Sequence, residues 1–299
     1  MNTIKTSFSI KDLENLSGIK AHTIRIWEKR YNLLIPERTN TNIRTYNLQS
    51  LQKLLNISFL NSNGYKVSRI AALDDFQIAT KVKEISFLGN VESHAFNAFK
   101  LSMLNFDQAL FYNTYNRLLE EKSFREIFYE LFIPIIQDMG LLWQTLTIKP
   151  SHEHFISVHI RQKVLIHIER IQSSNPKPDA KTFVLFLPLN EIHDIGLLFI
   201  NYELLSRGYH TIYLGENVPI EDLNLLNHLY KNITYVSYFT VKPDHDKLSA
   251  YLDTLYSEVI KNTTNSVRVL GTQLIDFNPK KLSKRIKLFK SIEDLVKDL

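Results

Sequence analysis

Glu191, His193 and Gly196 form the string E-x-H-x-x-G within LPLNEIHDIGLLF, where an apolar run gives way to a helical pattern. A histidine at such a strand-to-helix turn points away from the carboxyl edge of a sheet, so its imidazole can meet the metal of a planar cofactor. Imidazole suits cobalt, and Glu191 or Asp194 could accept the other ring N–H and fix the tautomer. Gly196 would let the helix backbone pack closely. Taken alone, the string also fits an ordinary histidine in a surface loop.

Trp143, Glu153 and His154 form a second spaced group, W-x9-E-H, where one helical pattern runs out near Pro150 and the next begins. A large aromatic side chain with a glutamate and a histidine at one end of a helical bundle can form a lid over a cofactor. The alternative is a core tryptophan followed by two exposed residues at a helix start. The two groups together therefore favour a cofactor site more strongly than either group does alone.

Distinct segments must position these residues. Residues 92–172 hold one glycine and two prolines, and their apolar residues recur at helical spacing, which predicts a helical bundle. The polar, proline-bearing segment 173–181 is the best linker candidate. Beyond it, apolar strands such as TFVLFLPL and ITYVSYF alternate with helical patterns, which predicts a parallel, doubly wound α/β domain over 181–299.

The length and composition indicate a multidomain globular protein of α and α/β class. The 299 residues suffice for two average domains or three small ones, with 44% apolar and 22% charged residues. The absence of cysteine excludes disulfides, zinc-thiolate sites, iron–sulfur clusters and a cysteine nucleophile, and it agrees with a reducing compartment. No signal peptide or membrane-spanning run is visible, so we expect a cytoplasmic protein without a membrane partner.

Positive charge is concentrated at the N-terminus. Residues 1–73 contain 11 Lys and Arg against 4 Asp and Glu, whereas the rest of the chain has 25 against 27. Phosphate attraction needs grouped cations, so this pattern predicts a nucleic-acid-binding head, which we place at residues 1–76. A second basic run over 280–290 is better explained as a solvated helix face, because its apolar residues interleave at helical spacing.

The head is predicted to fold as a helix-turn-helix with a wing. Ser9 can cap a helix over KDLENLS, Gly18 ends it, and AHTIRIWEKRY gives a second helix. LLIPERTNTNIRTYN suits a two-stranded wing, and a further helix begins at about Leu48. Trp27 lies on the apolar stripe of the second helix and is expected in the core.

Polar and basic side chains outside the apolar stripe of the second helix suit contacts with a major groove and its phosphates. The alternative is that the arginines form an ordinary solvent-exposed face. The candidate DNA-contacting residues are His22, Thr23, Arg25, Lys29, Arg30, Arg38, Arg44 and Tyr46. The succession TIRIWEKRY, PERT and RTY resembles the winged helix-turn-helix of the MerR transcription regulators. This resemblance implies binding to palindromic double-stranded promoter DNA as a dimer.

The head followed by the two spaced groups resembles, over essentially the whole chain, the cobalamin-binding light-sensing repressors of the CarH and LitR type. The resemblance implies a four-helix bundle over 80–174 and a flavodoxin-like (Rossmann-type) α/β domain over 181–299. The resemblance implies adenosylcobalamin as cofactor and His193 as the lower axial ligand of its cobalt. It further implies that the bundle caps the upper adenosyl group with Trp143, Glu153 and His154. Assembly as a dimer or tetramer is also implied, with light breaking the cobalt–carbon bond and loosening the hold on DNA.

Three further positions match this family or depart from it. Ser237 corresponds to a serine beside the nucleotide tail of the cofactor. Gly271-Thr272 stands where the family has two glycines that let the dimethylbenzimidazole tail approach the backbone, and the β-branched Thr272 could narrow that pocket. Gln144 follows Trp143 where a histidine would ligate cobalt after loss of the upper group.

These departures motivate one alternative, a MerR-like regulator whose degenerate cobalamin domain responds to a partner protein or another ligand. A second alternative is catalytic, a cobalamin-dependent methyltransferase or mutase subunit. The basic head and the lack of a substrate-binding barrel argue against it, so we expect no enzyme.

Overall fold

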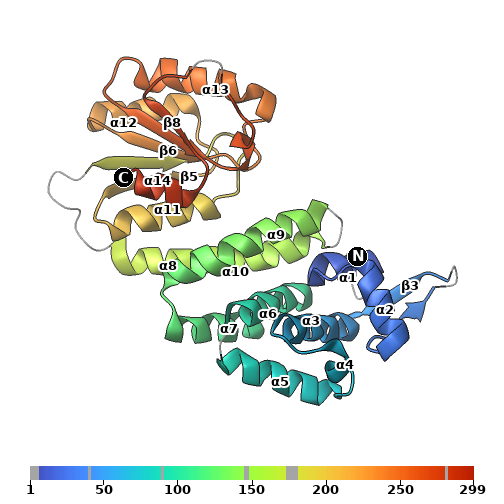
Figure 1. Cartoon of the computed structure of the whole chain (residues 1–299). Helices are drawn as coiled ribbons and strands as arrows, with labels where there is room; N and C mark the ends of the chain where they lie inside the picture. Colours follow the sequence, from blue (N-terminus) through green and yellow to red (C-terminus); the bar gives the residue numbers. More distant parts are fainter. Residues whose placement is uncertain (1–6, 40–41, 89–90, 145–147, 173–180, 280–281) are drawn as a thin grey trace. The chain divides into compact units, whose positions relative to one another are not determined.

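The chain forms two compact units, Met1–His159 and Ile160–Leu299, in the computed structural model shown in Figure 1. The structure describes all residues except 1–6, 40–41, 89–90, 145–147, 173–180 and 280–281; within helices it leaves out the side chains of 83–88, 91–93, 140–141 and 143–144. The predicted linker, 173–181, thus lies almost wholly outside the described residues. No helix in the described part is both long and apolar enough to cross a membrane.

The first unit opens with the predicted helix-turn-helix and wing. The elements are α1 (Ile10–Ser17), α2 (Ala21–Tyr31) and an antiparallel sheet of β1 (Ser7–Phe8), β3 (Arg44–Asn47) and β2 (Glu37–Arg38), in that spatial order. Ser9 caps α1 through reciprocal hydrogen bonds with Asp12, and Gly18 ends it at φ 73°, a left-handed conformation that suits glycine. The local predictions for the head are therefore confirmed.

The core of the head lies between these helices and the wing. Phe8, Ile24 and Trp27 are buried there, so the prediction for Trp27 is confirmed. The helix α3 (Leu48–Ser62) begins at the predicted residue, because the side chain of Asn47 accepts a hydrogen bond from the N–H of Ser50 and caps it.

A run of helices follows in the first unit. They are α4 (Val67–Ile70), α5 (Asp75–Leu88), α6 (Val91–Asn105), α7 (Gln108–Glu121), α8 (Phe124–Ile127), a π-helical turn (Phe128–Phe132), α9 (Ile133–Gln144) and α10 (Pro150–Gln172), which continues into the second unit. Phe111 packs against Phe99 and His159, with ring centroids 5.0 and 5.2 Å apart. The segments from α6 to α10 thus form the predicted helical region around an aromatic core.

The second unit is a five-stranded parallel sheet covered by helices. Its strands are β4 (Thr182–Phe186), β5 (His210–Gly215), β6 (Thr234–Tyr238), β7 (Ser266–Leu270) and β8 (Ile286–Phe289). The order β5-β4-β6-β7-β8 is the flavodoxin-like order, which confirms the predicted fold class.

Helices cover both faces of this sheet. The α-helices are α11 (Ile195–Ser206), α12 (Asn224–Leu229), α13 (Leu248–Leu255) and α14 (Ile292–Lys297). Short turns accompany them: 3-10 turns at Ile220–Leu223, His245–Lys247 and Thr272–Leu274, and a π-helical turn at Tyr256–Ile260. Figure 1 shows α11 and α14 on one face and α12 and α13 on the other. Because all five strands are parallel, the loops at their carboxyl ends lie along one edge of this open sheet.

Strand β8 shows that the helical interpretation of the basic run 280–290 is wrong. Ile286 lies opposite Val267 in parallel register with β7. Arg285 just before it donates hydrogen bonds at 2.5 Å to the carbonyl oxygens of Ile260 and Thr263, so it closes the end of a preceding helix. A short apolar run fits the periodicity of a helix and that of a strand, and here the pairing with β7 decides for the strand.

Candidate functional site

The carboxyl edge of the parallel sheet carries Glu191 and His193. Both lie in the loop after β4, and β4 pairs with β5 on one side and with β6 on the other. Connections from the central strands leave in opposite directions at such a switch point and open a crevice for a ligand. The fold therefore places the first predicted group where α/β domains bind ligands.

The buried carboxylate of Glu191 joins two loops. Its Oε2 accepts hydrogen bonds from the backbone N–H groups of residues 240–242, at 2.6 to 3.2 Å. Its Oε1 accepts from the N–H groups of Ile192 and His193, at 2.9 and 3.0 Å. Burial by itself would raise the pKa of Glu191, but the hydrogen bonds from the His193 side chain and from the backbone lower it to about 2. Glu191 is therefore ionised and fixed in place.

His193 takes its orientation from Glu191. Nδ1 of the imidazole lies 2.6 Å from Oε1 of Glu191, and it donates the hydrogen bond because the carboxylate is ionised. In the neutral ring, Nε2 then carries the lone pair that a metal ligand needs. The side chain is 46% exposed. Asp194 pairs instead with Arg161, whose Nε lies 2.8 Å from its Oδ2, so Glu191 is the residue that fixes the tautomer.

Four exposed apolar side chains lie at the same edge. Leu189 and Ile192 follow β4, Val241 follows β6 and Ile275 follows β7, and each is between 45% and 64% exposed. We call these four residues the apolar rim. Exposed apolar side chains grouped at one edge favour a large, partly apolar ligand. The sequence analysis missed the apolar rim. The signal that could have found it is an apolar residue shortly after the end of β4, β6 and β7.

Gly271 and Thr272 shape the loop after β7. Gly271 has φ 127°, and a Cβ there would lie 2.2 Å from the carbonyl oxygen of Phe239, so this position requires glycine. The hydroxyl of Thr272 donates to the carbonyl oxygen of Thr240 at 2.6 Å. Thr272 thus ties the loop after β7 to the loop after β6.

Two predicted cofactor-binding positions, Gly196 and Ser237, are covered by protein atoms. A Cβ at Gly196 would lie 2.7 to 3.0 Å from ring atoms of Tyr238, so the ring packs directly on the glycine. Ser237 is fully buried, and its hydroxyl donates to the carbonyl oxygen of Phe186 at 2.8 Å. The edge therefore fits a metal-bearing ring at His193, whereas the Ser237 hydroxyl, at the position matched to the nucleotide tail, is already bonded within the sheet. Tyr238 was not singled out from the sequence.

The second spaced group belongs to the first unit. Nδ1 of His154 lies 3.1 Å from Oε2 of Glu153, and Oε1 of Glu153 accepts from the hydroxyl of Ser157 at 2.9 Å. The side chain of His154 is 71% exposed at the start of α10. Trp143 lies on α9, and its side chain, like that of Gln144, lies outside the described residues. The structure thus brings Glu153 and His154 together on one helical turn.

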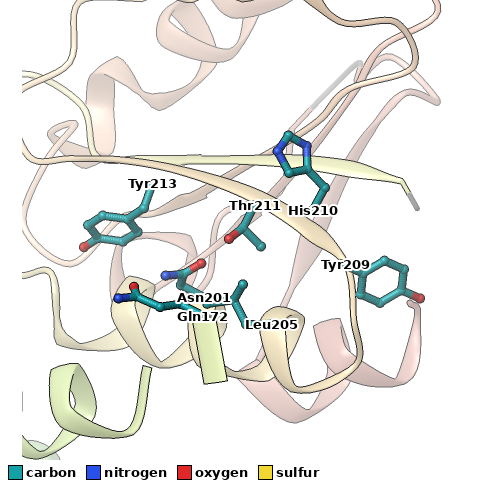
Figure 2. A pocket seen from close by; sticks show the side chains of 7 residues that line it. All are labelled: Gln172, Asn201, Leu205, Tyr209, His210, Thr211 and Tyr213. Carbon is teal, nitrogen blue, oxygen red and sulfur yellow. The ribbon is translucent and has the colours of Figure 1, made fainter. Parts of the chain in front are cut away.

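A separate hollow of about 350 Å³ lies beside the edge strand β5 (Figure 2). Its lining residues are Gln172, Asn201, Leu205, Tyr209, His210, Thr211 and Tyr213. Asn201 is buried, and within the described structure its Oδ1 has no hydrogen-bond partner. None of the predicted site residues lines this hollow, so it is distinct from the edge that carries His193.

The predicted DNA-contacting residues lie on α2 and the wing. The exposed ones are His22, Arg25, Lys29, Arg30 and Arg38, and the half-buried ones are Thr23 and Arg44. Ile26, which the sequence analysis did not select, is 52% exposed among the cations of α2. Cations with an apolar side chain between them suit phosphates and a thymine methyl group in a major groove.

Tyr46 is a correction to the predicted DNA-contacting set. It is only 1% exposed, and its hydroxyl donates to Oε1 of Glu28. Burial, and then Glu28, raise the pKa of Tyr46. Nε of Arg44 lies 3.4 Å from Oε2 of the same glutamate. Glu28, which the sequence analysis missed, therefore joins α2 to β3, and Tyr46 acts in the core because its ring packs inward from the wing.

Comparison with known proteins matches the head and the bundle separately. The profile of the MerR HTH family regulatory proteins matches residues 8–76, and that of the B12 binding domain matches residues 95–166. The chain thus combines the DNA-binding head of a MerR-type transcription regulator with a B12-binding domain.

Its relatives include two repressors of Myxococcus xanthus. The chain is 27% identical over 226 residues to the HTH-type transcriptional repressor CarH, covering 73% of each chain. It is 23% identical over 215 residues to the HTH-type transcriptional repressor CarA, covering 70% of this chain and 68% of CarA. Among solved structures, the monomethylamine corrinoid protein of Methanosarcina barkeri has a TM-score of 0.57 at 15% identity, covering 70% of this chain and 98% of that one. This last likeness is one of fold alone.

Proposed function

We propose that this chain is a light-sensing transcription repressor, controlled by adenosylcobalamin through cofactor-dependent oligomerisation. The observation that carries the proposal is the pair of Glu191 and His193, fixed at the switch point and bordered by the apolar rim. An oriented imidazole among exposed apolar side chains suits a metal held in a large ring. Relatedness to the repressors CarH and CarA supports repression as the outcome.

Each predicted residue then has a role. His193 would hold the cobalt through Nε2, and Glu191 keeps the proton on Nδ1. The apolar rim would exclude water from the ring, and Trp143, Glu153 and His154 would hold the upper adenosyl group. The bound cofactor supplies a cobalt–carbon bond that light breaks.

The affinity for DNA is controlled by the number of DNA-binding heads in one assembly. Two or four linked heads raise the effective concentration of one head at its half-site, so assembly tightens the hold on palindromic promoter DNA without new contacts. Loss of the adenosyl group removes its contacts with the bundle and loosens the assembly. We assign the head to residues 1–76, the bundle to 80–174 and the α/β domain to 181–299. We place this DNA-bound regulator in the cytoplasm.

The test is a visible spectrum of the full chain with adenosylcobalamin after gel filtration, in darkness and after green light. The parent should retain cofactor and change its spectrum in light, and His193→Ala should lose most of both. The matched control is His228→Ala, an exposed histidine at the end of α12 in the same unit, which should behave as the parent. Retention of cofactor by His193→Ala would refute the assignment.

Size-exclusion chromatography with light scattering tests the assembly. We expect a larger species with adenosylcobalamin in darkness than after light. The same mass under both conditions would separate cofactor binding from oligomerisation and refute that part of the proposal.

One observation favours a second candidate function. The hydroxyl of Ser237, the position matched to the nucleotide tail, is buried on the carbonyl oxygen of Phe186, and the neighbouring Tyr238 ring packs on Gly196. In that case the chain is a MerR-type regulator whose degenerate B12-binding domain responds to a partner protein or another ligand. A parent that stays colourless with adenosylcobalamin supports this candidate. Tyr238→Ala should then gain cobalamin binding, whereas binding of cobinamide, which lacks the tail, should not depend on residue 238.

A further inference from the structure

Lys100 is a buried cation of the first unit that the proposed function does not use. It lies on α6 and is 8% exposed. Its Nζ donates to the carbonyl oxygen of Leu16 at 3.1 Å and lies 2.7 Å from Oδ2 of Asp138. The ring centroid of Phe96 is 4.7 Å from the same atom. Leu16 belongs to α1 and Asp138 to α9, so one ammonium group joins three helices that are distant in the sequence.

The contact with Leu16 completes the C-terminus of α1. The last carbonyl groups of a helix have no partner within the helix. At α1, the N–H of Gly18 donates to the carbonyl of Glu14 at 2.9 Å, and the hydroxyl of Ser58 donates to that of Ser17 at 3.3 Å. Lys100 donates to the carbonyl of Leu16. It is the charged donor of the three, since the other two are a backbone N–H and a hydroxyl. A cation at this end also interacts favourably with the helix dipole.

Asp138 stabilises the cation where it lies. A buried ammonium group is unfavourable without a counter-charge, and removal of one partner from a buried pair leaves the other uncompensated. Without the carboxylate, the flexible side chain of Lys100 would gain by turning toward solvent and leaving Leu16. Asp138 lies on α9, whereas α1 is separated from α2 only by residues 18–20. The contact therefore connects a bundle helix with the end of α1 from which the DNA-binding helix follows.

We propose that Lys100 is a positioning residue for DNA binding, which transmits the position of α9 through Asp138 to the C-terminus of α1 and so to α2. A ligand or partner that moves α9 away from Lys100 would loosen the end of α1 and change the orientation of α2. The proposal goes beyond the proposed function, because it applies to any ligand that acts on the bundle.

The test is amide hydrogen exchange on the full chain without cofactor. Asp138→Asn removes the counter-charge and keeps the shape of the side chain. The matched control is Glu130→Gln in the π-helical turn that leads into α9; it breaks the pair with Lys122, whose Nζ lies 2.5 Å from Oε2 of Glu130. We expect the amides of residues 16–20 to exchange about tenfold faster in Asp138→Asn, because the end of α1 opens locally. Glu130→Gln should leave them unchanged.

A second variant tests whether the effect of Asp138 acts through Lys100. Lys100→Met should accelerate the same amides, and the double variant should not exceed it, because both changes act through one ammonium group. If Lys100→Met does not fold, the comparison of Asp138→Asn with Glu130→Gln decides alone. Unchanged exchange in Asp138→Asn, an equal increase in Glu130→Gln, or additive effects in the double variant would overturn the proposal.

DNA binding gives the functional readout. With a mixed-sequence 30-base-pair duplex at low salt, Asp138→Asn should weaken binding several-fold relative to Glu130→Gln. Equal affinities would overturn the link to α2. No cobalamin is present in these measurements, so their failure leaves the proposed function standing, and a colourless parent protein leaves this inference standing.

Discussion

Nδ1 of His193 lies 2.6 Å from Oε1 of Glu191, a carboxylate that five backbone N–H groups hold in place. These hydrogen bonds come from the loop after β4 and from the loop after β6. The imidazole is thus oriented from both sides of the switch point before any ligand arrives, which reduces the ordering cost of binding. Glu191 consequently matters for the stability of the domain as well as for its site.

Glu191→Gln should lower the free energy of unfolding in a pH-dependent way. The pKa of Glu191 in the folded protein is about 2, below the 4.5 of an unperturbed glutamate. A group with a lowered folded pKa stabilises the fold above its unfolded pKa, and this contribution is lost as pH falls from about 4.5 toward 2. The shift corresponds to roughly 3 kcal/mol at neutral pH. Chemical denaturation at pH 7 and pH 3.5 should show a smaller gap between parent and variant at the lower pH; a constant gap would contradict the assignment.

Gly196→Ala should destabilise the parent but be tolerated once Tyr238 is replaced by alanine. The added methyl group would lie 2.7 to 3.0 Å from the ring, and overpacking of this kind costs about 1–3 kcal/mol. Urea denaturation of both single variants and the double variant gives the coupling energy between the two positions. A coupling near zero would mean that the ring can leave Gly196 freely.

Arg25→Ala and Arg30→Ala should each weaken DNA binding about equally on all sequences. Both side chains are exposed on α2, and loss of one phosphate contact reduces the slope of log K against log salt by about 1. Fluorescence anisotropy over a series of salt concentrations measures the slope. Lys261→Ala, an exposed cation of the second unit, is the control and should keep the parent slope. A parent-like slope in both arginine variants would remove them from the interface.

Tyr46→Phe should reduce stability without changing the salt dependence of DNA binding. The phenylalanine keeps the buried ring but leaves Glu28 without the hydroxyl donor, which costs about 1–3 kcal/mol for a buried acceptor. Thermal unfolding measures the first effect and anisotropy the second. Weaker DNA binding at unchanged stability would return Tyr46 to the DNA-contacting set.

Much of the head could be predicted because its signals are local. The cap at Ser9, the left-handed Gly18 and the start of α3 at Leu48 depend on residues within one turn of each other. Tyr46 could not be placed in this way, since a wing residue can face DNA or the core. Its direction depends on Glu28, eighteen residues away.

The sequence alone determined that a basic helix-turn-helix precedes a helical region and a parallel α/β sheet, because capping, periodicity and charge act over short stretches of chain. Only the tertiary structure decided that Glu191, and not Asp194, orients His193, and that Tyr238 covers Gly196. Glu191 is held by the loop after β6, some fifty residues further along the chain, and the Tyr238 ring of β6 reaches Gly196 of α11 across about forty residues. Contacts of that kind exist only after the strands have paired.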